Sequence, residues 1–496
     1  MNTQIQTGSV QPVVRRDPAD WAIPAAGSAQ RWALAGAWLL TAYYFLTSIY
    51  ISLHRQFWFD EVLTTRTVRL QNWQAIWDSL KVGDSPNPIG FFAVARLFDQ
   101  WFGPSEIGIR LPATLGVIAG MWLTYHATRR VTDRLHGLLA MAVLTCSFLP
   151  YYAYEGRSYG LHFLLAAFAL WVWTARRSPF LLAGAFFLGV LVHYYMVLCM
   201  LPLLAEEAYH WRPWRRPSFH IVAATLGAAG GLIGILPLVL ISKRGWSGDF
   251  WAAPSGLQVP SLYTGIFPAG LFLVSLTALW VILNRGPENL PAHPVTSAER
   301  TGWFALLIPV AGYILGKLVT HALVDRYLIG MLPGVALAFA CLCYRRWAPT
   351  PRIYAGVLLL FAGHGIYTQS LTVRHPEKIE ACGQTEGRTR AMVAMEERLW
   401  AAGAHHIVIT YPDCLYQTAR YYSQHPERYV WWTNPGKQPR NFVHYPVQYW
   451  TLDDVKQHSR DAVFVDINTA KLETLQATGA RTTVHTADGL SLTRAE

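Results

Sequence analysis

The sequence predicts a polytopic α-helical membrane protein with a small α/β domain near its C-terminal end. Of its 496 residues, 52% are hydrophobic and only 14% are charged, whereas soluble domains carry about 25% charged residues. Apolar runs of about twenty residues recur through the first three quarters of the chain, and a helix of that length crosses about 30 Å of hydrocarbon. The runs do not alternate between apolar and polar residues, so we expect helices and not barrel strands.

The positions of the basic residues explain the net charge of +11. They form short clusters between apolar runs, which is the pattern that the positive-inside rule predicts for cytoplasmic loops. We therefore expect membrane lipid and no nucleic acid as a partner. The clusters are Arg129, Arg130 and Arg134; Arg176 and Arg177; Arg212, Arg215 and Arg216; and Arg345 and Arg346.

This rule also predicts the topology. Residues 1–30 lack the apolar core of a signal peptide and are expected to form a cytoplasmic tail. A transmembrane domain is expected over 31–372, with its first external loop at 54–109. Within that loop Ile89 to Phe102 is expected to lie along the interface or to be re-entrant, because a full crossing would turn every later basic cluster outward. The predicted spans are Arg31 to Leu53, Leu111 to Thr128, Leu138 to Tyr152, Leu161 to Ala175, Pro179 to Val192, Tyr195 to Tyr209, Phe219 to Ile241, Ser261 to Leu283, Trp303 to Val319, Tyr327 to Cys343 and Tyr354 to Gln369.

These about eleven crossings place the C-terminal part outside. Residues 373–496 have the composition of a soluble domain, with β-like runs at His405 to Thr410 and Ala462 to Ile467 and a helical pattern at Arg388 to Ala402. We therefore predict a periplasmic α/β domain. Cys382 and Cys414 are its only cysteines and are expected to form a disulfide, the alternative being two unrelated thiols. No Cys/His spacing predicts a zinc site.

Ionisable residues gather on the outer side of this topology. Charged residues at the outer ends of several transmembrane helices cost free energy unless they form ion pairs or bind a substrate. The set therefore predicts an active site or a substrate pathway. The alternative is a group of solvated loop charges. The set comprises Asp60, Glu61, Asp84, Glu106, Arg110, Glu155, Arg157, His193, Lys243, Arg244, Asp249, His321, Asp325 and Arg326.

Two kinds of side chain in this set suggest group transfer. Asp60 and Glu61 follow three aromatic residues that should anchor them at the membrane surface, where partial desolvation raises the basicity of a carboxylate. Arg157 and Arg326 suit a phosphate, because a guanidinium presents a rigid fork to two oxygens. Glu155 and Asp325 precede them closely and would neutralise them when no substrate is bound.

Four ordered elements resemble a known family. They are the first external loop, with FWFDE, SPNPIGFF and WFGPSEIGIRLPATLG; YYAYEGRSYGL; HYY at His193 to Tyr195; and DRYLIGMLPG at Asp325 to Gly334. From about residue 30 to 345 the chain resembles the bacterial branch of the protein O-mannosyltransferase-like family, which belongs to the GT-C glycosyltransferases.

The resemblance implies a hexosyl- or pentosyltransferase of the bacterial inner membrane. Such an enzyme transfers a sugar, with inversion, from a polyprenyl-phosphate donor to a glycan, lipid or protein acceptor on the periplasmic face. Asp60 would act as the base beside Glu61, and Lys243 and Arg244 would join the two arginines at the donor phosphate. The supporting residues are Asp84, Asn87, Arg110, Glu155, Tyr159, His193, Tyr194, Asp325 and Tyr327.

One departure affects the metal prediction. The family often has His-Pro-Pro where this chain has Asn87-Pro88-Ile89, and the outer loop contains no Asp-x-Asp motif. A role for Mg²⁺ or Mn²⁺ therefore stays open.

Two rival functions fit a helical bundle with ionisable residues. A transporter of lipid-linked or small polar substrates usually carries inverted repeats and midplane charges, and neither is evident in this sequence. A non-catalytic scaffold with a periplasmic binding domain would leave Asp60 replaceable.

Overall fold

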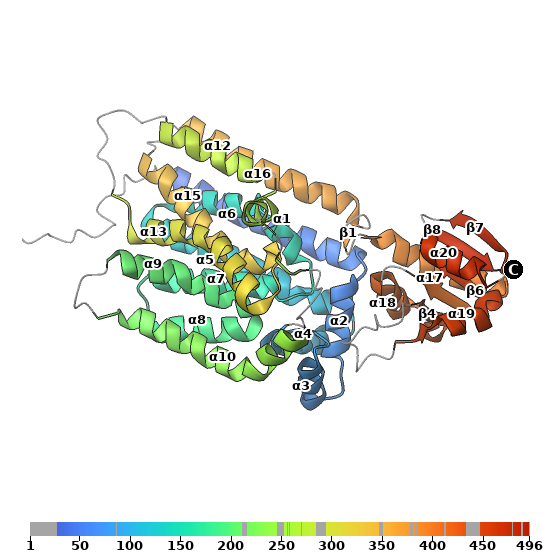
Figure 1. The fold of residues 1–496 in the computed structure, drawn as a ribbon. Helices are drawn as coiled ribbons and strands as arrows, with labels where there is room; N and C mark the ends of the chain where they lie inside the picture. Colours follow the sequence, from blue (N-terminus) through green and yellow to red (C-terminus); the bar gives the residue numbers. More distant parts are fainter. Residues whose placement is uncertain are drawn as a thin grey trace, which may run out of the picture.

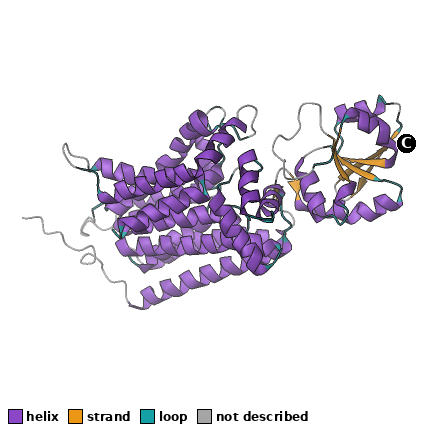
Figure 2. Cartoon of the chain, turned by 90° about the horizontal axis from the view of Figure 1, so that it is seen from below, coloured by secondary structure: helices purple, strands orange, loops and turns teal. Residues whose placement is uncertain are grey.

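The computed structural model of the 496-residue chain describes most of the sequence. The described ranges are 27–85, 87–210, 216–245, 252–254, 256, 258–268, 270–283, 294–346, 351–376, 380–381, 384–410, 413–432, 447–478, 480–487 and 490–495. They form a long helical bundle followed by a small domain that contains a sheet (Figures 1 and 2).

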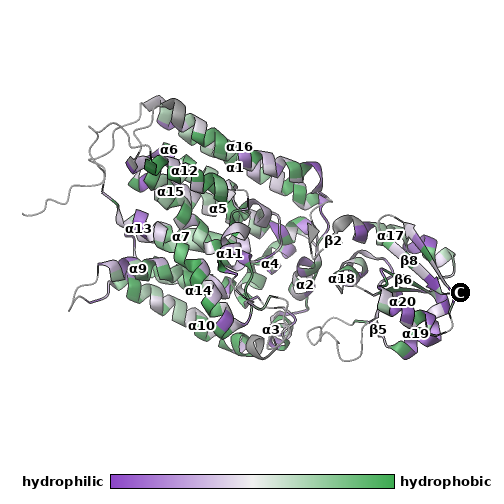
Figure 3. Cartoon of the chain, turned by 45° about the horizontal axis from the view of Figure 1, so that its top comes forward, coloured by the Kyte–Doolittle hydropathy of each residue, from purple (hydrophilic) through white to green (hydrophobic). Residues whose placement is uncertain are grey.

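The bundle is built from helices at nearly all the predicted spans. Their bounds are α1 Gly27–His54, α5 Glu106–Val131, α6 Arg134–Thr145, α7 Tyr159–Thr174, α8 Pro179–Val192, α9 Leu201–Tyr209, α10 Phe219–Gly245, α11 Val259–Ile266, α12 Gly270–Leu283, α13 Ser297–Phe304, α14 Ile308–Leu315, α15 Leu332–Arg346 and α16 Pro351–Arg374. Hydrophobic residues predominate along the helices of this bundle (Figure 3), and large apolar residues such as Leu39, Leu226 and Leu359 are exposed on α1, α10 and α16. Such an exposed apolar surface is expected where lipid is the solvent.

Five helical segments are long and apolar enough to cross a membrane by themselves. They are Gly27–His54, Glu106–Val131, Phe219–Leu240, Ser297–Thr320 and Asp325–Arg345. Three shorter apolar helices, α6, α7 and α8, pack among them. The predicted span from Ser261 to Leu283 is bent by 93° between α11 and α12, a pair that would count as one further span. The described part is thus a multi-span helical membrane protein.

Short helical turns interrupt the bundle. They are η2 Leu149–Ala153, η3 Tyr194–Met200, η4 Ala305–Leu307, η5 Gly316–Thr320 and η6 Asp325–Met331. The predicted span Leu138 to Tyr152 accordingly ends as a regular helix at Thr145, and the span predicted to begin at Tyr195 starts as the tight turn η3. Three of these turns, η2, η3 and η6, lie next to the ionisable residues of the predicted site.

Residues 54–109, which the sequence predicts as the first external loop, fold into three helices, α2 Phe59–Val68, α3 Trp73–Val82 and α4 Ile89–Phe102. Gly83 ends α3 with a φ of 85°, the left-handed conformation that glycine adopts without strain. The loop has its own apolar core, which includes Phe57, Val62 and Phe92. Helix α4 packs against α2, α5 and α8, so the loop is held rigidly on the bundle.

The C-terminal domain is a six-stranded mixed sheet with helices on both faces. The strand order is β5-β4-β3-β6-β8-β7, in which β3, β4, β5 and β6 pair in parallel and β8 runs antiparallel to β6 and β7. The strands are β3 His406–Ile409, β4 Tyr429–Trp432, β5 Tyr449–Trp450, β6 Ala462–Val465, β7 Thr482–Ala487 and β8 Leu490–Ala495, and a small separate pair is β1 Glu380–Ala381 with β2 Gln384–Thr385.

Alternating side chains of the strands supply two cores. Ile407 and Ile409 of β3 pack with Met392 and Leu415, which come from α17 Glu386–Ala401 and α18 Asp413–Tyr422. Val408 packs on the other face with side chains of α19 Leu452–His458 and α20 Thr469–Gln476. The two strands and the helix predicted from the sequence are β3, β6 and α17.

Helix α18 joins this domain to the first external loop (Figure 1). The Tyr422 hydroxyl accepts a hydrogen bond from the Phe57 backbone N–H at 2.5 Å and donates one to Glu106 at 3.0 Å. Arg69 of the loop donates to the Tyr421 hydroxyl at 2.9 Å, and Arg66 donates to Gln417 at 2.5 Å. The sheet domain is therefore docked on α2.

Candidate functional site

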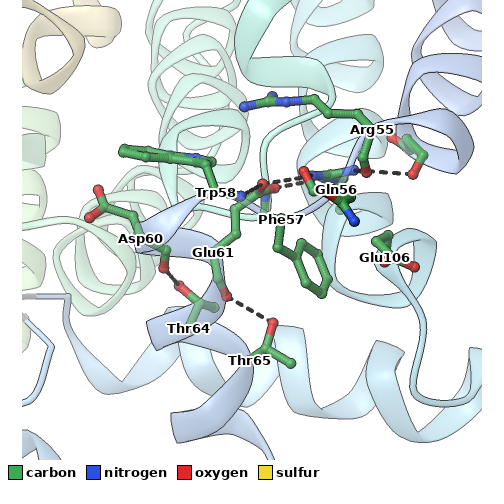
Figure 4. Close-up of polar contacts among 12 residues, drawn as sticks. Arg55, Gln56, Phe57, Trp58, Asp60, Glu61, Thr64, Thr65 and Glu106 are labelled. Carbon is green, nitrogen blue, oxygen red and sulfur yellow. Dashed lines mark hydrogen bonds and ion pairs between the residues drawn. The ribbon is translucent and has the colours of Figure 1, made fainter. Parts of the chain in front are cut away.

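Asp60 and Glu61 lie in the first turn of α2. Helix α2 begins after Trp58, whose backbone N–H donates to the Glu61 carboxylate at 3.2 Å, and acidic residues at this end interact favourably with the helix dipole. The two side chains point to different sides of the helix (Figure 4). The two neighbouring carboxylates therefore have different surroundings.

Glu61 is fully buried and saturated with hydrogen bonds. Arg110 of α5 donates to both of its oxygens at 2.7 Å, and the Gly156 backbone N–H donates to Oε1 at 2.6 Å. Burial alone would raise the pKa of Glu61, but the adjacent Arg110 guanidinium lowers it below the ordinary value. Arg110 also donates to the backbone carbonyl groups of Ser52 and Arg55. This geometry favours a structural role for Glu61 over the catalytic role that the sequence predicts.

Asp60 lies between two guanidinium groups. Its Oδ2 is 3.6 Å from Nη2 of Arg157 and 3.7 Å from Nη2 of Arg326, and its side chain keeps 19% of its surface exposed. The three predicted residues are thus brought together from the first external loop, the segment before α7 and η6. The exposed carboxylate is accessible to an incoming group, and both cations lie beside it.

Arg157 is held in place by uncharged groups as well. It donates to the Asp60 backbone carbonyl at 3.2 Å and to Thr64 Oγ1 at 3.1 Å. When its amide oxygen faces the guanidinium, Asn87 accepts from both terminal nitrogens of Arg157, at 3.1 and 3.2 Å, and its amino group donates to Ser158 at 3.2 Å. Asn87 occupies the position where the resembling family often has histidine, and here it orients an arginine.

Arg326 is positioned by aromatic residues. Its Nε donates to the Tyr159 hydroxyl at 2.9 Å, and its guanidinium lies over the rings of Trp58 and Tyr159. The rings of Tyr159, His193 and Tyr327 contact one another. These predicted supporting residues therefore form one aromatic wall behind the two arginines.

Glu155 does not neutralise Arg157 or Arg326 as expected. It is 1% exposed, and within the described residues neither of its carboxylate oxygens has a hydrogen-bond partner. Burial raises the pKa of Glu155 to about 7, an effect that the nearby Arg326 charge only partly offsets. Asp325 accepts a hydrogen bond from the Arg326 backbone N–H at 2.7 Å.

The remaining predicted residues lie in several places. Asp84 is buried and accepts a hydrogen bond from Ser79 at 2.8 Å, which closes the end of α3. Tyr194 begins η3 beside His193. Lys243 and Arg244 lie in the last turns of α10, and their side chains fall outside the described part of the chain.

The cysteine prediction is tested in part. Cys146, Cys199, Cys341 and Cys343 are free and buried, and Cys414 is disulfide-bonded. Cys382 lies outside the described residues, so its pairing with Cys414 stays a prediction.

Three contacts of the site were not predicted from the sequence. Thr64 binds Arg157, Trp58 faces Arg326, and Tyr422 fixes the segment before α2. The spacing of Asp60 and Thr64, one helical turn apart, is the only sequence signal for the first of these. In the described ranges, groups of three or more potential metal ligands occur in the C-terminal domain, away from Asp60.

Comparisons with known proteins bear on the family and the fold of the chain. Residues 86–241 match the family model of dolichyl-phosphate-mannose-protein mannosyltransferases. The chain shares its fold with ArnT from Cupriavidus metallidurans in the apo state, with a TM-score of 0.60 and 14% identity over 94% of this chain and 98% of that one. The same protein bound to undecaprenyl phosphate gives a TM-score of 0.59 at 14% identity over the same shares.

An oligosaccharyltransferase from Archaeoglobus fulgidus gives a TM-score of 0.42 at 10% identity over 80% of this chain and 64% of that one. A search of curated protein sequences finds no match. The match to the mannosyltransferase family model over residues 86–241 and the fold shared with ArnT agree with the resemblance to GT-C glycosyltransferases that the sequence predicts.

Proposed function

We propose that the chain transfers a hexose or pentose from a polyprenyl-phosphate donor to a hydroxyl acceptor, at the periplasmic face of a bacterial inner membrane. The observation that carries this proposal is the position of Asp60 Oδ2 between Arg157 and Arg326. A carboxylate for the acceptor and two guanidiniums for the donor phosphate thus meet at one place. The acceptor is a glycan, lipid or protein, and the C-terminal part lies on the same side as Asp60.

The two arginines would bind the donor phosphate. Each presents hydrogen-bond donors in a fixed plane, and a phosphate can accept from both guanidiniums. The Arg326 guanidinium contacts Asp60 and Tyr159. Lys243 and Arg244 of the last turns of α10 are proposed as further cations for the same phosphate.

The helical turn η6, which carries Arg326, also contributes Gly330 to the wall of a small apolar cavity. The cavity is lined by residues of α7, α9 and η6, among them Ala166, Leu203 and Gly330. Since a 3₁₀ helix rises about 2 Å per residue, Gly330 lies about 8 Å along η6 from Arg326. These apolar lining residues supply an apolar environment on the same helical turn as Arg326, which suits a lipid-linked donor.

Asp60 would then act as the general base. Its carboxylate takes the proton of the acceptor hydroxyl as that oxygen attacks the anomeric carbon, and the bond from this carbon to the phosphate oxygen breaks. The released lipid phosphate gains negative charge, which Arg157 and Arg326 stabilise. A single displacement inverts the anomeric centre. Glu61 and Arg110 hold the helix that carries Asp60.

The proposal is tested with the purified chain in proteoliposomes supplied with radiolabelled polyprenyl-phosphate sugars and a panel of envelope acceptors. We expect transfer by the wild type and a loss of about 10²–10⁴-fold in Asp60→Asn, the range for removal of a general base. Asp78→Asn, on the exposed face of α3, is the matched control and should retain activity. Full transfer by Asp60→Asn would contradict the proposal.

A further inference from the structure

Three potential metal ligands meet at one edge of the C-terminal sheet. His406 is the first residue of β3, His458 is the last residue of α19, and Asp461 directly precedes β6. The parallel pairing of β3 with β6 places His406 opposite Ala462, and the His405 backbone N–H donates to the Asp461 carbonyl at 2.7 Å. Regular strand pairing therefore fixes the position of this cluster.

The potential ligand atoms of the three side chains are close together. One ring nitrogen of each histidine and one carboxylate oxygen lie within 4.8 Å of one another. Within the described chain, neither these ring nitrogens nor the Asp461 carboxylate has a hydrogen bond or an ion pair, and the Nδ1 of His406 is shielded from solvent without a partner. A shielded polar atom without a partner costs free energy unless something binds it.

A second cluster in the same domain shows the opposite arrangement. Glu396, Glu397 and His425 are equally close, but Arg428 lies 3.7 Å from Glu396 and 3.0 Å from Glu397. Ser423 also donates to Glu396 at 2.7 Å. Because its carboxylates are already neutralised, this cluster has little affinity left for a cation and serves as an internal comparison.

We propose that His406, His458 and Asp461 bind a divalent cation of the zinc type. Two imidazoles and one carboxylate are a ligand set that zinc prefers, whereas Mg²⁺ prefers oxygen ligands. Ligand atoms of a tetrahedral zinc site lie about 3.3 Å apart, since each is about 2.0 Å from the metal, so small rotations of these partly exposed side chains would bring the three ligand atoms to that spacing. The fourth position is left to water.

The surrounding residues favour this assignment. The Trp450 ring stacks on His458 at 5.4 Å and meets the edge of His406 at 4.9 Å, which limits the orientations of both imidazoles. A bound ion would join α19 and the turn before β6 to β3. It would therefore stabilise the sheet edge opposite the carboxyl ends of the parallel strands, independently of sugar transfer.

The test is calorimetric titration with ZnCl₂ of the full chain in detergent, purified without a histidine tag and stripped with EDTA. We expect one tight equivalent in the wild type that excess MgCl₂ does not displace, together with a higher melting temperature. His458→Gln and Asp461→Asn change partly exposed side chains and should each weaken this equivalent at least about tenfold, the lower range for disturbing the surroundings of a metal ligand.

The matched control is His425→Gln in the second cluster, which should leave the tight equivalent unchanged. Retention of that equivalent by the His406→Gln/His458→Gln double variant would overturn the proposal, as would its loss in His425→Gln or its absence from the wild type. None of these readouts depends on transferase activity, so they are independent of the function proposed above.

Discussion

Arg326 lies 3.7 Å from the Asp60 carboxylate, although Arg326 directly precedes the predicted span Tyr327 to Cys343 and Asp60 lies in the first external loop. The Arg326 guanidinium is held there by Tyr159, at the start of α7, and by Trp58, two residues before Asp60. The site therefore forms only when segments that are far apart in the chain, α2 and η6, pack together.

Removal of the Arg326 charge should weaken use of the donor. A hydrogen bond to a charged group contributes about 1.5–3 kcal/mol, so Arg326→Gln is expected to lower kcat/KM for the lipid donor by about ten- to a hundredfold, and Arg326→Lys by less. Steady-state transfer assays measure this. The control is Arg345→Gln, which removes an arginine paired with Glu299, and an equal loss there would contradict a donor-specific role.

Loss of Arg110 should destabilise the fold. Its removal leaves the Glu61 charge buried and unpaired, which costs about 3–5 kcal/mol. We expect a lower melting temperature for Arg110→Ala and a smaller decrease for Glu61→Gln. Glu61→Gln should keep measurable transfer activity if it only positions α2. A stable Glu61→Gln protein as inactive as Asp60→Asn would restore a catalytic role to Glu61.

Glu155 should make stability depend on pH. Burial raises its pKa from 4.5 to about 7, so the folded state holds this proton more tightly than the unfolded chain. The resulting stability is fully present below about pH 4.5 and is lost as the pH rises through about 7. Glu155→Gln cannot ionise, so the wild type should lose melting temperature relative to this variant between pH 5 and pH 8. Parallel melting curves across this range would contradict the inferred burial.

The Tyr422 hydroxyl should couple the sheet domain to α2. Tyr422→Phe leaves the Phe57 N–H and Glu106 without this partner, at a cost of about 1–3 kcal/mol. Hydrogen exchange at residues 55–63 should become faster, as measured by mass spectrometry. Tyr449→Phe alters an exposed tyrosine of β5 and should change nothing there. Equal exchange in Tyr422→Phe and the wild type would show that the contact does not hold the loop.

The sequence predicts the fold correctly where the length and the periodicity of an apolar run are enough to identify a helix. Spans such as α8, Pro179–Val192, coincide with the prediction. An unbroken apolar segment in lipid must satisfy its backbone hydrogen bonds internally, and a helix does so. The bend between α11 and α12 was missed because Phe267 and Pro268 lie within an apolar stretch, and composition does not report direction. The strands β7 and β8 were missed because their alternating pattern is short and polar on one side.

The sequence predicts which residues belong to the site better than it predicts which of their side chains contact one another. The sequence predicts Asp60, Arg157 and Arg326 together, since topology places them on one side. It does not separate Asp60 from Glu61, because that difference depends on Arg110 approaching one side of α2 only. Within the described residues Glu155 forms no hydrogen bond with the arginines that it was expected to neutralise, although their charges act on it, since two residues of separation in an irregular segment do not fix orientation.

The docking of α18 on α2 limits whether the C-terminal domain can be exchanged for that of another protein. A domain tethered only by α16 could be exchanged between relatives as a module. Here Phe57, Glu106 and Arg69 of the membrane part are matched to tyrosines of the soluble part. A chimaera that exchanges the C-terminal domain must therefore carry these tyrosines with it, or it will lose order in the loop that holds Asp60.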